Sequence, residues 1–135
     1  MKSINIKLKK NDDNIVPFVW VNGKKENEFH ISSVLSGEGN KITLLGIFLG
    51  TKENFLKFDT DIKHTGLHTK SLTILRAVFL NNSSFSNDGM IRIKKGAKNT
   101  NAYFDSKVLL FDNAKGRSVP SLEIDENEVK AGHGS

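Results

Sequence analysis

The sequence predicts an all-β fold, and two observations carry this prediction. Seven short segments are rich in β-branched and aromatic residues, and each is bounded by Gly, Asn, Asp or Ser, as strands commonly are. No window of a dozen residues keeps a clean helical period, and only residues 26–34 could form a short helical turn. The predicted strands are, in chain order, Val16–Val21, Ile42–Leu49, Phe55–Ile62, Leu72–Leu80, Met90–Lys94, Lys107–Phe111 and Ser121–Ile124.

Each predicted strand has its own local signal. The first three read VPFVWV, ITLLGIFL and FLKFDTDI, and they adjoin an Asn-Gly pair, a Gly and an Asn respectively. The fourth, LTILRAVFL, is followed by Asn81 and Asn82. The last three read MIRIK, KVLLF and SLEI, and they end close to Gly96, Asp112 and Asp125. Residues of these turn-forming types end strands because they adopt backbone conformations that a ladder does not use.

The even spacing of the later strands predicts how they are arranged. These strands begin at residues 72, 90, 107 and 121, at intervals of 14 to 18 residues, with turn residues between them at 81–83, 95–96 and 112–113. Such spacing is typical of the coils of a solenoid or of a sandwich of short strands. The two-residue linkers of tight hairpins occur only at Asn22-Gly23 and Asp88-Gly89. We therefore favour a solenoid of parallel strands.

The composition fits one domain without cysteine chemistry. A chain of 135 residues, of which 37% are hydrophobic, is long enough to form a single core. The absence of cysteine excludes disulfides, thiolate metal sites and cysteine nucleophiles. Residues 1–14 lack the apolar run of a secretory signal, and the longest apolar stretch, Ile42–Leu49, is far shorter than the roughly 20 residues that span a bilayer. We expect a cytoplasmic protein with no membrane partner.

The net charge of +5 raises nucleic acid as a partner. The basic residues lie in small groups, at 7–10, 24–25 and 92–95. However, Arg92 and Lys94 alternate with isoleucines, which is typical of the solvent face of an ordinary strand. No RNP, zinc-finger or helix-turn-helix pattern accompanies the charge, so we do not expect nucleic-acid binding.

Two groups of side chains could carry metal or acid–base chemistry. His64 and His68 are four residues apart, but their segment is not helical by pattern, and on a strand their Cβ atoms would lie about 13 Å apart. We expect both to form hydrogen bonds at a turn or along a sheet face. Of the acidic residues at 123, 125, 126 and 128, Glu123 alternates with apolar neighbours and is expected to face outward, and residues 125–127 read as a turn. With no Ser/His/Asp set, Walker loop or dinucleotide fingerprint, we expect no enzyme.

The most specific signal is a series of sequence blocks in the stretch from Asp61 to Gly134. They read DIKHTGLHTKS from Asp61, FSNDGMIRI from Phe85, GAKNTNA from Gly96, VLLFDNA from Val108 and VPSLEIDENEVKAGHG from Val119. In this order and at these separations, the blocks resemble the core domain of the SufB/SufD family, which belongs to the SUF iron–sulfur cluster assembly system. The resemblance covers roughly residues 34–135, and the pattern PSLEI followed by VKxxHG is its most specific element.

The resemblance implies a right-handed parallel β-helix and a scaffold that is not itself an enzyme. In this family a SufB-like and a SufD-like subunit pair through their β-helices, bind the SufC ATPase, and serve nascent cluster assembly and iron delivery. The SufD-type histidine of the terminal motif matches His133, and imidazole is a suitable ligand for iron. The resemblance therefore implies that the partner is a SufB-like subunit or a second copy of this chain.

The chain also departs from the family pattern. Ala131 stands where SufD-like members often carry a cysteine, and the SufB-type cysteine position aligns approximately with Asp105. Because the chain offers no thiolate, it resembles SufD more than SufB. The sequence stops at Ser135, where relatives continue. We therefore expect residues 1–135 to form a single core domain that lacks the C-terminal helical region of its relatives, and this puts binding of the ATPase in doubt.

These expectations lead to a small set of site residues. His133 is the candidate ligand for iron or a cluster; its alternative reading is a frayed terminal residue with no ligand. The last strand would leave an unpaired edge, which a β-helix caps or pairs with another subunit. We expect no stably bound cofactor, only iron or an iron–sulfur cluster held transiently at a subunit interface. The interface candidates are Val119, Pro120, Leu122, Glu123, Ile124 and Val129.

Two other functions stay open at this point. One is a β-helix enzyme that acts on acidic polysaccharide, which the basic surface and the solenoid pattern suggest, although the calcium-binding Asp cluster is missing. The other is a basic nucleic-acid-binding domain, which would bind with strong salt dependence.

Overall fold

The computed structural model describes residues 1–8, 12–21 and 27–135. Within these ranges the chain forms ten strands and no helix. No helix in this part of the chain is therefore long and apolar enough to cross a membrane. The strands are β1 Lys2–Ile6, β2 Asp13–Val21, β3 Glu28–Leu35, β4 Lys41–Gly50, β5 Phe55–His64, β6 Lys70–Phe79, β7 Ser84–Ile93, β8 Thr100–Leu110, β9 Lys115–Ile124 and β10 Val129–Gly134.

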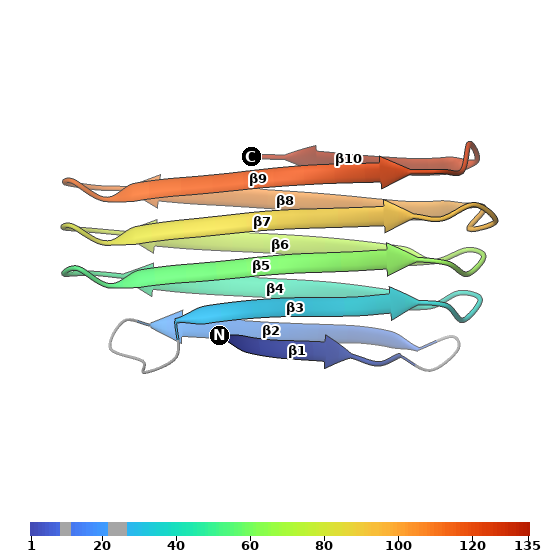
Figure 1. Ribbon diagram of the computed structural model, residues 1–135, viewed down its shortest axis with the longest axis horizontal. Coiled ribbons are helices and arrows are strands. Elements are labelled where there is room, and N and C mark those ends of the chain that lie inside the picture. The colour runs from blue at the N-terminus through green and yellow to red at the C-terminus, as the bar shows by residue number, and fades with distance from the viewer. Residues whose placement is uncertain (9–11, 22–26) are drawn as a thin grey trace.

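The strands form two parallel sheets that stack coil upon coil. The odd strands make one five-stranded sheet, in the order β1-β3-β5-β7-β9, and the even strands make the other, in the order β10-β8-β6-β4-β2. In Figure 1 the odd strands run rightward in front, the even strands return leftward behind, and the chain climbs from the N-terminus to the C-terminus. This path is a right-handed coil. The prediction of an all-β, right-handed parallel β-helix is confirmed.

Strict alternation along each strand builds the core. In β5, for example, the burial pattern alternates without a break, so that every second side chain lies inside the coil. Parallel pairing in register then stacks inner residues above inner residues from coil to coil. Aromatic rings fill the centre: the ring of Phe48 lies 4.8 Å from Phe58 and 5.7 Å from Phe85, and Phe85 lies 5.3 Å from Phe79, measured between centroids. Such ring contacts stabilise the core beyond what the burial of apolar surface contributes.

The turns between strands also repeat from coil to coil. Lys52, Asn81 and Asp112 occupy equivalent turn positions, and all three have positive φ angles near 60°. The backbone N–H of Lys52 donates to Asn81 Oδ1, and that of Asn81 donates to Asp112 Oδ2. Side chains of one turn thus satisfy backbone donors of the turn below. The turns expected at 81–83, 95–96 and 112–113 are confirmed.

The outer face of the odd-strand sheet is polar and ion-paired. Ile91 and Ile93 are buried, and Arg92 between them points outward, where its guanidinium lies 3.2 Å from Asp61 and 2.9 Å from Glu123 on the neighbouring strands. Arg117 pairs in the same way with Asp88 at 3.0 Å. Arg92 thus lies on a solvent-facing strand surface, as the alternation predicted, and its charge is largely balanced.

Two local expectations were wrong. Most of the segment 26–34, proposed as a helical turn, lies in β3, because Ile31, Ser33 and Leu35 alternate inward and complete the coil. Asp88-Gly89 is no hairpin linker but the middle of β7. Gly89 is needed there for space: a Cβ at this position would lie 2.5 Å from the ring of Phe104. The Asn22-Gly23 signal and the basic residues at 9–10 and 24–25 lie outside the described residues.

A buried histidine closes one corner of the core. His64 is fully buried, with Nδ1 2.8 Å from Thr69 Oγ1 and Nε2 2.8 Å from Ser71 Oγ. Thr69 in turn contacts Thr100 Oγ1 at 3.2 Å, and Thr100 donates to the carbonyl of Ala97. In one arrangement that satisfies every group, Ser71 donates to Nε2 and Nδ1–H donates to Thr69. The expectation that His64 forms hydrogen bonds near a turn is confirmed, and His68 lies exposed in that turn.

We predict that acid destabilises the protein through His64. Burial lowers the pKa of His64 to about 4, from an unfolded value of 6.5, so the unfolded chain binds the extra proton between these values. The contribution of neutral, buried His64 to the free energy of unfolding is therefore fully present above pH 6.5 and is lost as the pH falls toward 4. From pH 7 to pH 5 the free energy of unfolding should decrease by about 2 kcal/mol through this group. Urea unfolding at both pH values measures it, and H64Q, which cannot titrate, should lack this part of the decrease.

We also predict that any side chain at position 89 destabilises the fold. In G89A the added methyl group would displace the Phe104 ring, which lies among fully buried neighbours, so the free energy of unfolding should fall by about 1–3 kcal/mol. G132A is the matched control, because a Cβ there would meet only ordinary contacts, 3.4 Å from Tyr103. Thermal unfolding compares the two variants, and equal melting temperatures would contradict the assigned role of Gly89.

Candidate functional site

The last coil leaves the β-helix open at its C-terminal end. β9 pairs with β7 and β10 pairs with β8, and both stand at the end of their sheets. In the part of the chain that the structure describes, no strand lies against their other edges. Each edge therefore presents unpaired backbone N–H and C=O groups, which favour pairing with a further strand.

Four of the six predicted interface residues lie on the inner row of this open end. By register, Pro120, Leu122 and Ile124 stand above Gly89, Ile91 and Ile93, all of which are inside the coil below. No strand of the described residues covers this row, and Leu122 is 37% exposed and Ile124 is 42% exposed. In the other sheet, Val129 is an inward residue of β10; it stands above Thr100 and contacts the core.

The other two predicted interface residues point to the side. Val119 and Glu123 alternate with the inner row and lie on the outer face of β9. Glu123 lies 2.9 Å from Arg92 and 3.7 Å from Lys94, so its carboxylate joins β9 to β7. It faces outward, as its alternation with apolar neighbours predicted. Glu123 can contribute to a partner surface only at the rim of the open end.

His133 belongs to the inner row of β10. Its register partner is Phe104, a buried core residue, so His133 lies on the inward side of the strand, yet it is exposed because the end is open. It is part of a paired strand rather than a frayed tail. In the described residues no three His, Asp or Glu side chains gather to hold a metal ion. His133 could therefore supply one ligand to a metal ion, and any other ligands would have to come from outside this chain.

Asp105, at the position of the SufB-type cysteine, lies on the other side of the sheet. Its register partner is Gly134, one residue beyond His133, so Asp105 faces outward where His133 faces inward. Its carboxylate accepts a hydrogen bond from Arg76 at 2.8 Å. Asp105 and His133 therefore cannot form one ligand set within this chain.

The remaining acidic residues of the last turn have structural roles. The carboxylate of Glu126 accepts hydrogen bonds from the backbone N–H groups of Gly96, Asn127 and Glu128. These hydrogen bonds, the one from Glu128 most of all, lower the pKa of Glu126. Glu128 lies 4.0 Å from Lys98. This turn closes the last coil and shows no arrangement for acid–base catalysis.

A cavity lies beside the end of β10. β10 ends at Gly134, next to the last residue of the given sequence, while β8 extends to Leu110. The cavity there has a volume of about 300 Å³, and its lining includes Ser106, Val108, Leu110 and Ser118. These residues could not be identified from the sequence, because the run VLLF is apolar at inner and outer positions alike.

The family model for the SufBD core domain of SUF system FeS cluster assembly matches residues 8–135 of this chain. The chain belongs to the SufBD core family. Among characterised relatives, it is 32% identical over 100 residues to the iron–sulfur cluster assembly protein SufD of Bacillus subtilis (strain 168). That match covers 73% of this chain and 23% of the relative, so the chain spans less than a quarter of that SufD protein. The predicted resemblance to this family, closer to SufD, is confirmed.

Proposed function

We propose that this SufBD core chain is a non-catalytic scaffold subunit in iron–sulfur cluster assembly, which pairs through its open C-terminal end with a SufB-like subunit or a second copy of itself. The observation that carries the proposal is the exposed inner row of the last coil, set between two unpaired strand edges, in a chain of a cluster-assembly family. Its cytoplasmic location, expected from the sequence, belongs to the same proposal.

The chemistry of the open end supports pairing. The unpaired edges of β9 and β10 offer backbone hydrogen bonds, and the half-exposed side chains of Leu122 and Ile124 offer apolar surface. A second β-helix end placed against this one would pair with the backbone groups of the strand edges and bury the apolar side chains.

Iron or an iron–sulfur cluster would be transient cargo at that interface. His133 lies at the open end, and its imidazole could supply one ligand once a partner supplies the rest. The proposed role includes no stably bound cofactor and no binding of nucleic acid or a membrane. No observation favours the polysaccharide enzyme: among the described residues, no three His, Asp or Glu side chains gather into a cation site.

We predict that charge on the inner row prevents pairing. In L122D/I124D two carboxylates would be buried at the interface, so co-purification with a SufB-like protein should weaken by at least about tenfold. Size-exclusion chromatography with light scattering after co-expression measures the complex and also detects a homodimer. V34D is the matched control, because Val34 is half-exposed on the outer face of β3, away from the open end. A wild-type chain that remains monomeric with and without the partner would refute the proposal.

We predict that His133 contributes to iron binding by the paired protein and not by the single chain. H133A should form the complex normally and should lose most of the ferrous iron that the wild-type complex retains under anaerobic conditions. Iron analysis of the purified complex checks this, with H30A as control, since His30 lies on the outer face of the odd-strand sheet. Equal iron in H133A and wild type would remove His133 from the site and leave the pairing proposal intact.

A further inference from the structure

The outer face of the even-strand sheet is apolar, in contrast to the ion-paired outer face of the odd-strand sheet. Outward residues stack in register across β2, β4, β6 and β8, and one complete row reads Val21, Leu49, Val78 and Leu109. We call this surface the apolar face. Its outward apolar residues are Ile15, Pro17, Val19, Val21, Leu45, Ile47, Leu49, Leu72, Ile74, Val78, Tyr103 and Leu109.

The apolar face is accessible and has a groove. Ile47 is 57% exposed and Leu109 is 58% exposed, and a groove of about 310 Å³ runs between them beside Arg76 and Lys107. Arg76 is balanced by Asp105. A contiguous apolar surface of this kind on a folded chain commonly marks an interaction site.

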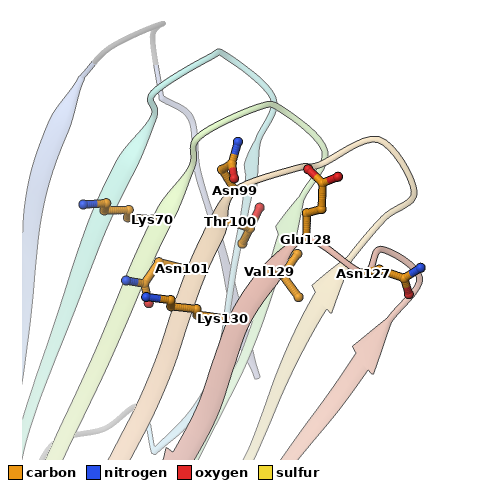
Figure 2. A pocket seen from close by; sticks show the side chains of 8 residues that line it. All are labelled: Lys70, Asn99, Thr100, Asn101, Asn127, Glu128, Val129 and Lys130. Carbon is orange, nitrogen blue, oxygen red and sulfur yellow. The ribbon is translucent and has the colours of Figure 1, made fainter.

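One margin of the apolar face is basic. Lys41, Lys70 and Lys130 are stacked in one outward row at the start of β4, β6 and β10, with Asn101 between the last two. Figure 2 shows the side chains of Lys70, Asn101 and Lys130 extending from the same side of their strands. Among the described residues none of these lysines forms a salt bridge, and the acidic residue of the row is Asp13 on β2. Like charges opposite each other cost stability, so folding does not explain the row.

We infer that the apolar face binds an amphipathic helix of a partner protein, with the acidic flank of that helix against the basic margin. The face measures roughly 20 Å along the strands and 19 Å across them, from the strand rise and spacing. A helix of about 14 residues is roughly 21 Å long and 10 Å wide, so it fits the length of the face. This site lies on the side of the β-helix and is separate from the open end.

The same quantities argue against other occupants. The face offers roughly 400 Å² in projection, about half of the 800 Å² that each partner buries in a standard interface, so a second copy would be weakly held. An extended peptide would place its unpaired backbone groups on apolar side chains, because every strand of the face but the edge ones is already paired on both sides. A helix satisfies its own backbone groups and can insert a side chain into the groove.

Two synthetic helical peptides test the inference. Both have about 14 residues and the same stripe of leucines, and they differ only in one flank, which carries glutamates in one and lysines in the other. Titrated into the full chain and followed by fluorescence anisotropy, the glutamate peptide should bind at least about tenfold more tightly than the lysine peptide. K41Q/K70Q should abolish that preference, and added salt should reduce it. Equal binding of both peptides by the wild-type chain would overturn the inference.

Variants of the apolar face separate this site from the open end. I47S/L109S removes exposed apolar groups that the helix would cover, so the affinity for the glutamate peptide should fall by at least about tenfold. V34S on the opposite sheet is the matched control and should bind normally, and L122D/I124D should also bind normally. Thermal unfolding verifies that each variant is folded. Two results would overturn the inference if neither peptide binds. Dimerisation that I47S/L109S abolishes would assign the face to a second copy. Binding to anionic lipid vesicles that I47S/L109S abolishes would assign it to a membrane.

Discussion

The in-register parallel ladder between coils is the interaction on which the rest of the structure depends. It places each residue beside the equivalent residue of the next coil, 29 positions later for Ile31 and Thr60 and 31 positions later for Ile91 and Leu122. Because side chains alternate along a strand, this register sorts the whole chain into inner and outer rows. The aromatic core, the ion pairs of one outer face and the apolar rows of the other are consequences of the same constraint.

The ladder also explains why the two outer faces differ so sharply. Stacking places the outward residues of neighbouring strands side by side. A charged residue is therefore either balanced by its neighbour, as Arg92 is by Asp61, or lies beside a like charge, as Lys41 and Lys70 do. Rows of balanced charges and rows of apolar residues both stabilise strand pairing, whereas like charges directly opposite each other cost stability. The open end is the third outcome, since the ladder stops there with its hydrogen-bonding groups unused.

Much of the fold could be predicted from the sequence, because β-branched runs bounded by turn residues identify strands. β1, β3 and β10 escaped that reasoning, since polar residues interrupt the apolar ones in β1 and β3, and two glycines and two polar residues do so in β10. His133 and the interface residues came from family resemblance. Their placement could not be predicted, because the register that turns His133 inward and Asp105 outward is set by the lengths of the turns. The apolar face was missed since runs such as ITLLGIFL hide which residues face inward.

Coil length has an implication for how such a chain tolerates insertions and deletions. Between His64 and Ile93 the repeat is 29 residues, but between Lys70 and Asn101 it is 31, so the two additional residues lie between Ile93 and Asn101, where the chain turns from β7 into β8. Extra length there leaves every row aligned. One residue gained or lost inside a strand would exchange the interior and exterior positions beyond it, exposing phenylalanines and burying lysines. Natural variation in length among such chains should therefore concentrate at turns, and whole coils should be gained or lost as units.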